Sequence, residues 1–98
     1  MSYERLGEQA FRHADGHEVK IISDNHMEYA EKGRRRVAVV GFDKPPGRRF
    51  RIFTRELSRW FLESGEQHPM SDAERAIVLD RIAKAYRFGG YEVVIVPR

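Results

Sequence analysis

The chain has no cysteine and no hydrophobic run long enough to cross a membrane. Without cysteine, disulfide bonds and thiolate metal sites are excluded, so packing alone must hold the fold together. The first 16 residues also lack the apolar core of a secretory signal, and a membrane-spanning helix needs about 20 apolar residues. These absences predict a cytoplasmic protein with no membrane association.

Common catalytic motifs are missing as well. The sequence contains no phosphate-binding glycine loop, no nucleophile elbow and no zinc-protease motif. No group of titratable residues stands out as a nucleophile with its base. We therefore predict that the protein is not an enzyme and binds no cofactor.

Histidines supply the remaining candidates for metal binding. His13 and His17 are four residues apart, with Asp15 and Glu18 as possible companions, and this spacing would suit a metal ion on a helix. Asp15-Gly16 lies between the two histidines and favours a turn, which interrupts such a helix. We therefore predict loop histidines and no metal site.

Size and composition predict one α+β domain over residues 1–98. Of the 98 residues, 41% are hydrophobic and 34% are charged, which allows a small core. The net charge of +3 conceals an uneven distribution, because residues 32–59 carry +8 and the other residues carry −5. This basic segment must either be neutralised locally or meet an acidic partner.

The first half of the chain is predicted to form a helix and then strands. Residues 1–16 are expected to be a short helix, over Ser2 to His13, or a loosely ordered segment. Alternating apolar residues predict a strand over 17–24 and a hairpin over 26–42, with Gly33 in a three-residue loop. The expected register places Met27 opposite Val37, Glu28 opposite Arg36 as an ion pair, and Tyr29 opposite Arg35.

The second half contains the strongest local signals. A turn over 43–47 leads to a third meander strand over 48–53, and then to a short helix or turn over 54–64 and a loop over 65–69. Ser71 and Glu74 form a capping box that predicts a helix over 72–88, ended by Gly89-Gly90. Its buried stripe is Leu79, Ile82, Ala83 and Tyr86, supported by Ala76 and Val78.

Residues 91–97 are apolar on both faces, which predicts a strand inside the sheet. We expect a mostly antiparallel sheet, a meander plus the C-terminal strand, covered on one face by the helix.

Two kinds of partner remain open for the basic segment. Nucleic acid would contact the arginines of residues 33–55 and stack bases on Phe50, Phe53 or Trp60. A protein would use the apolar second face of the meander, with Ala38, Val40 and Phe42 ringed by arginines, and a homodimer is the alternative partner. The modest net charge favours the protein. The expected contact residues are Arg35, Phe42, Arg48, Arg49, Arg51 and Trp60.

Several segments carry a resemblance to a known family. They are "MEYAEKGRRRVAV" at 27–39, "RFRIFTRELSRW" ending at Trp60, "SDAER" at 71–75, and "GYEV" at 90–93. In these segments the chain resembles small bacterial immunity proteins of polymorphic toxin systems, in particular the seventy-fourth numbered immunity family. Residues 1–16 have no counterpart. The resemblance implies an α+β protein that neutralises a cognate toxin domain by binding it, with no chemistry of its own.

Overall fold

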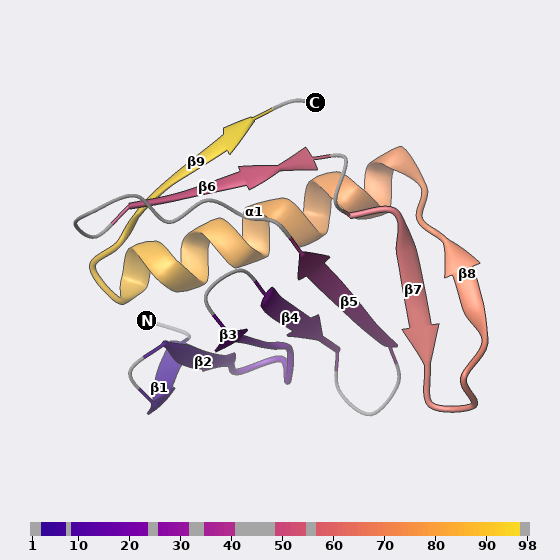
Figure 1. Ribbon diagram of the computed structural model, residues 1–98. Helices are drawn as coiled ribbons and strands as arrows, with labels where there is room; N and C mark the ends of the chain where they lie inside the picture. The colour runs from indigo at the N-terminus through magenta and orange to yellow at the C-terminus, as the bar shows by residue number, and fades with distance from the viewer. Residues whose placement is uncertain are drawn as a thin grey trace.

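The computed structural model describes residues 3–7, 9–23, 26–31, 35–40, 49–54 and 57–96, with backbone only at 23, 35, 36 and 38–40. Within these residues the chain forms an α+β fold of nine strands and one helix (Figure 1). The elements are β1 (Tyr3–Gly7), β2 (Ala10–His13), β3 (Glu18–Ser23), β4 (His26–Ala30), β5 (Arg35–Val40), β6 (Arg49–Phe53), β7 (Arg59–Leu62), β8 (Gln67–Pro69), α1 (Asp72–Phe88) and β9 (Glu92–Val96).

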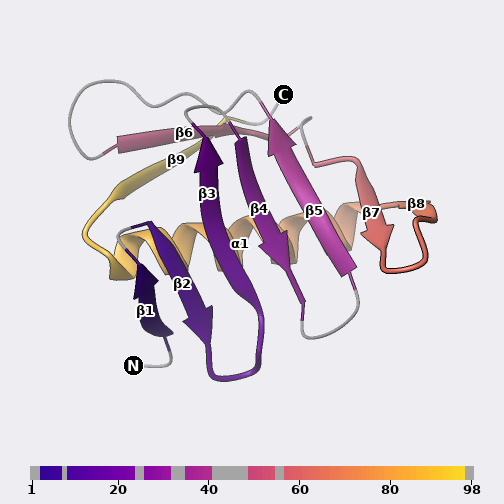
Figure 2. The ribbon, with the colours of Figure 1, turned by 60° about the horizontal axis from the view of Figure 1, so that its bottom comes forward.

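The strands form two sheets, and the helix packs against both (Figure 2). The larger sheet is antiparallel and has the order β1-β2-β3-β4-β5-β7-β8, which confirms the predicted meander covered by one helix. The smaller sheet pairs β6 with β9 in parallel. It runs across one end of the meander strands, beside the helix.

The helix matches its prediction closely. Ser71 accepts a hydrogen bond from the backbone N–H of Glu74, the Glu74 carboxylate accepts one from the backbone N–H of Ser71, and Gly89 caps the other end. The four residues of the predicted stripe are buried, and so is Val78. Ala76 is exposed, so its predicted place on the buried face is wrong.

The N-terminal segment forms a strand hairpin, so the predicted helix over residues 2–13 is wrong. β1 and β2 are antiparallel, with Tyr3 opposite His13 and Arg5 opposite Phe11. Strand alternation explains the burial better than helical spacing does, because Phe11 is fully buried while its neighbour Arg12 is exposed. Leu6, which helical spacing places on the apolar face, is 43% exposed.

The hairpin of β4 and β5 is confirmed, but its register differs from the prediction by two residues. Met27 lies opposite Val39, Glu28 opposite Ala38 and Tyr29 opposite Val37. The predicted Glu28–Arg36 ion pair is therefore wrong. A two-residue shift keeps every side chain on the same face of a strand, so the hydrophobic pattern is equally compatible with both registers. Gly33 and the 43–47 turn lie outside the described residues.

Three predictions in the second half are wrong because the strands pair differently. β6 is a strand as expected, but it pairs with β9 and not with the meander. The expected turn is present at the start of 54–64, where the Leu57 N–H donates to the Thr54 carbonyl at 3.1 Å, but residues 59–62 and 67–69 form β7 and β8, which pair with each other. Among the described residues β9 pairs only with β6, so it is not inside the sheet.

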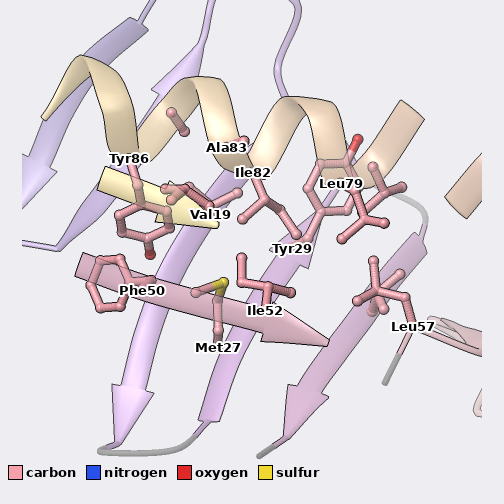
Figure 3. Packing of buried hydrophobic residues seen from close by; sticks show 14 of the residues in the cluster. Val19, Met27, Tyr29, Phe50, Ile52, Leu57, Leu79, Ile82, Ala83 and Tyr86 are labelled. Atoms are coloured by element: carbon pink, nitrogen blue, oxygen red, sulfur yellow. The ribbon is translucent and has the colours of Figure 1, made fainter. Parts of the chain in front are cut away.

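The core lies between the helix, the meander and the small sheet (Figure 3). Tyr86 and Ile82 of the helix face Phe50 and Ile52 of β6, and Met27 of the meander lies beside them. The Phe50 ring meets Tyr86 edge-on with centroids 5.2 Å apart and also contacts Tyr91 at 4.8 Å. The inner face of the small sheet is therefore part of the hydrophobic core.

Candidate functional site

The outer face of the small sheet carries two of the arginines expected to contact a partner. Because residues alternate along a strand and paired residues share a side, this face consists of Arg49, Arg51 and Phe53 on β6 and Glu92, Val94 and Val96 on β9. The opposite side of the same strands holds Phe50, Ile52 and Val93, all buried in the core. We call the first set the outer face.

Charge and apolar surface are combined on the outer face. The guanidinium of Arg49 lies 3.1 Å from the carboxylate of Glu92, so Arg49 has a cross-strand partner that the sequence did not reveal. Arg51 is exposed and lies opposite Val94, which is 38% exposed. Ile95 lies opposite Ile52, on the other side of the strand pair, and is 36% exposed.

Parallel strands are normally covered on both faces. Here the helix and the meander cover one face of the β6–β9 pair, and no other strand or helix of the described residues lies over the outer face. Among the described residues, the outer face is therefore left uncovered where a parallel strand pair is usually buried.

The other residues expected to contact a partner are placed differently. Trp60 is 2% exposed, so its indole is part of the core and offers no surface to a partner. Arg35 lies opposite Leu62 in the backbone register, and its side chain is not described. Phe42 and Arg48 lie outside the described residues.

A second group of polar side chains gathers at the turn between β2 and β3. Residues 13–17 form a tight turn in which the His13 N–H donates to the His17 carbonyl at 2.8 Å, and Gly16 has a φ of 103° that favours glycine. The turn brings the two imidazoles face to face, with centroids 4.7 Å apart and planes 9° from parallel.

Asp15 occupies the middle of this turn. Its Oδ1 accepts a hydrogen bond from the His17 backbone N–H at 3.0 Å and lies 2.6 Å from Nδ1 of His17 and 3.3 Å from Nδ1 of His13. Partial burial alone would raise the pKa of Asp15, but the backbone hydrogen bond from His17 and the nearby imidazoles outweigh it and lower that pKa.

His17 is held from the other side of its ring. It is 3% exposed, and its Nε2 lies 3.0 Å from the hydroxyl of Tyr3, which donates a hydrogen bond to the Arg81 carbonyl at 3.2 Å. Burial lowers the pKa of His17 even though Asp15 opposes the shift. The neutral imidazole is therefore favoured in the folded chain.

Arg81 links the turn to the meander. Its guanidinium donates to the Tyr29 hydroxyl at 2.8 Å, lies 3.4 Å from the Glu31 carboxylate, and approaches Asp15 Oδ2 at 3.9 Å. Tyr29 in turn donates to Glu31 at 3.1 Å, and burial raises its pKa to about 12. The sequence did not reveal this network, because no local pattern relates residue 81 to residues 15 and 29.

The buried histidine predicts a pH-dependent stability. In the presence of a chelator, the free energy of unfolding should fall as the pH drops below about 6.5, where histidine in an unfolded chain takes up its proton. The lowered pKa of His17 delays protonation in the folded chain, so protons favour the unfolded chain in this window. The lowered pKa of Asp15 acts in the same direction, but only below about pH 4.

Urea unfolding of the native chain and of His17→Gln at about pH 7.5 and about pH 5.5 measures this effect. The native chain should lose more stability between the two values than His17→Gln does. Equal losses would show that His17 does not carry the effect.

Comparison of the chain with protein-family models, with curated proteins and with solved structures found no match. Among the residues that the structure describes, no helix has the length and apolar character needed to cross a membrane.

Proposed function

We propose that this chain is a non-enzymatic protein-binding domain and that its outer face is the docking surface. One observation carries the proposal: a parallel strand pair covered by the core on one side presents arginine, valine and phenylalanine on the other. Arginine and aromatic residues are enriched at protein interfaces, whereas parallel sheets usually have both faces buried. A partner with apolar side chains and a carboxylate opposite Arg51 would complement this face.

The resemblance to immunity proteins supplies the kind of partner. We propose a cognate toxin domain that this chain neutralises by binding. Electrostatic attraction to an acidic toxin surface would chiefly speed their association. A second copy of the chain is the alternative occupant of the same face.

Local neutralisation of the arginines argues against nucleic acid. In the basic segment, Arg49 lies 3.1 Å from the Glu92 carboxylate, and outside it Arg12, Arg75 and Arg81 each lie within 4.0 Å of a carboxylate. Of the three side chains considered as stacking platforms, Phe50 and Trp60 are buried in the core. Single-strand binding relies on both exposed aromatic rings and unpaired cations.

The test is a binding titration with the cognate toxin domain that this function requires. Arg51→Glu and Val94→Asp should each weaken binding at least about tenfold, as central interface residues do. The matched controls are Arg59→Glu, an exposed arginine on β7, and Ile77→Asp, which replaces a 52% exposed residue of the helix. Both controls should bind as the native chain does.

Two results would contradict this function. If the outer-face variants bind as tightly as the controls, the docking surface lies elsewhere. If single-stranded or duplex oligonucleotides bind at about micromolar affinity with a steep salt dependence that Arg51→Glu reduces, the protein is a nucleic-acid-binding module.

Concentration-dependent dimerisation that Val94→Asp abolishes would assign the face to a second copy.

A further inference from the structure

We propose that the turn between β2 and β3 binds a divalent transition-metal ion of the zinc type, with His13, Asp15 and His17 as its protein ligands. One nitrogen or oxygen from each of these side chains lies within 4.8 Å of the other two. The objection to a metal site in the sequence was the missing helix. The tight turn removes that objection, because it brings residues 13 and 17 face to face without a helix.

The hydrogen bonds around His17 fix which of its nitrogens is available. The single proton of the Tyr3 hydroxyl is donated to the Arg81 carbonyl, so the hydroxyl oxygen accepts from Nε2–H of His17. Nδ1 then carries a lone pair. Metal-binding histidines are oriented in the same way, with the ring nitrogen that does not bind the metal donating a hydrogen bond.

The contact between His17 and Asp15 places two candidate ligand atoms side by side. Nδ1 of His17 is buried, makes no aligned hydrogen bond, and lies 2.6 Å from Oδ1 of Asp15. A nitrogen lone pair and a carboxylate oxygen repel each other at this distance unless both bind the same cation, a proton or a metal ion. A metal ion bound to both atoms would turn this repulsion into attraction.

His13 provides the third ligand from the solvent side. Its Nδ1 also carries a lone pair, because it accepts a hydrogen bond from the Asp15 backbone N–H at 3.1 Å. Metal binding would exchange this hydrogen bond for a metal–nitrogen bond. The side chains of His13 and Asp15 are 25% and 44% exposed, so they can rotate toward the fixed His17.

The three ligand atoms must move to a common spacing before they can bind one ion. Around a tetrahedral zinc ion with bonds of 2.0–2.1 Å, neighbouring ligand atoms stand about 3.4 Å apart. Rotation of the two exposed side chains would bring the three ligand atoms to this spacing, and water would complete the coordination.

Donor type and charge select the class of ion. Two imidazoles and one carboxylate suit zinc, nickel and copper better than magnesium or calcium, which prefer oxygen ligands. Asp15 and Glu31 together outweigh the charge of Arg81, the guanidinium that lies 3.9 Å from Asp15 Oδ2. The surroundings therefore carry a net negative charge that favours a divalent cation.

The experiment is a calorimetric titration of the untagged chain with Zn²⁺, with Mg²⁺ as the control ion. We expect one Zn²⁺ per chain at a Kd of about 10 μM or tighter and no heat from Mg²⁺. His13→Gln and Asp15→Asn alter partly exposed side chains and should each weaken binding at least about tenfold. His68→Gln is the matched control, because His68 pairs with Glu66 on the exposed β8 region and should leave the affinity unchanged.

Two further measurements keep the outcome decisive. Tyr3→Phe removes the hydroxyl that orients His17 and should weaken Zn²⁺ binding by about tenfold, with unchanged circular dichroism. In the native chain Zn²⁺ should shift the imidazole ¹⁵N resonances of His13 and His17 but not those of His68. Zn²⁺ affinity that survives His13→Gln and Asp15→Asn, or no binding below about 100 μM Zn²⁺, would overturn the proposal.

Discussion

Replacing Phe50 with alanine is expected to lower the free energy of unfolding by about 3–5 kcal/mol. Phe50 is fully buried, and its ring contacts Tyr86 of the helix and Tyr91 just before β9. The truncation removes these contacts and leaves a cavity between the helix and the small sheet. Since domains of this size are stable by only about 5–15 kcal/mol, the loss is a large share of the total.

Chemical unfolding of Phe50→Ala and of a matched control measures this loss. The control is Phe61→Ala on β7, where the phenylalanine is 36% exposed and should cost less than about 1 kcal/mol. If Phe50→Ala does not fold, Phe50→Leu keeps most of the volume and should lose about 1–2 kcal/mol. Equal effects of Phe50→Ala and Phe61→Ala would mean that β6 does not pack into the hydrophobic core.

Gly89→Ala is expected to destabilise the fold by about 1–3 kcal/mol, through crowding rather than backbone strain. Gly89 has a φ of −79°, which any residue adopts. A Cβ at this position would collide with the ring of Phe11, which is fully buried. The helix C-terminus and β2 meet at this point, so the substitution should push them apart.

Two variants test the crowding explanation. Gly7→Ala places a methyl group at an ordinary 3.9 Å from the Ala10 side chain and should change the stability by less than about 0.5 kcal/mol. Phe11→Leu combined with Gly89→Ala should be less destabilised than the sum of the single variants, because the smaller side chain relieves the collision. Strict additivity would contradict the proposed contact.

The helix was predictable because its signals are local. The capping box, the spacing of Leu79, Ile82, Ala83 and Tyr86, and the terminal glycines all lie within the element they define. Strand pairing depends on distant residues. Nothing in "RFRIF" indicates that it pairs with residues 92–96, some forty positions away, rather than with the preceding strand. Apolar alternation fixes the face of a strand but leaves shifts of two residues open, as in the β4–β5 register.

The candidate sites were also predictable only where the signal is local. The sequence identified the exposed arginines of β6, but it could not show that Arg49 pairs with Glu92 or that Trp60 lies in the core. It also identified His13, Asp15 and His17 as a group. Their convergence depends on a tight turn, and the burial of His17 depends on Tyr3 and the helix. Both follow from the tertiary fold.

Amide hydrogen exchange on the complex with the proposed cognate toxin domain tests the central claim most directly. If the outer face is the docking surface, binding should slow exchange in peptides covering residues 49–53 and 92–96. Peptides covering β1 and β2, at the end of the large sheet opposite β7 and β8, should exchange as in the free chain. Protection confined to β1, β2 or β3, with no change in β6 and β9, would contradict the account.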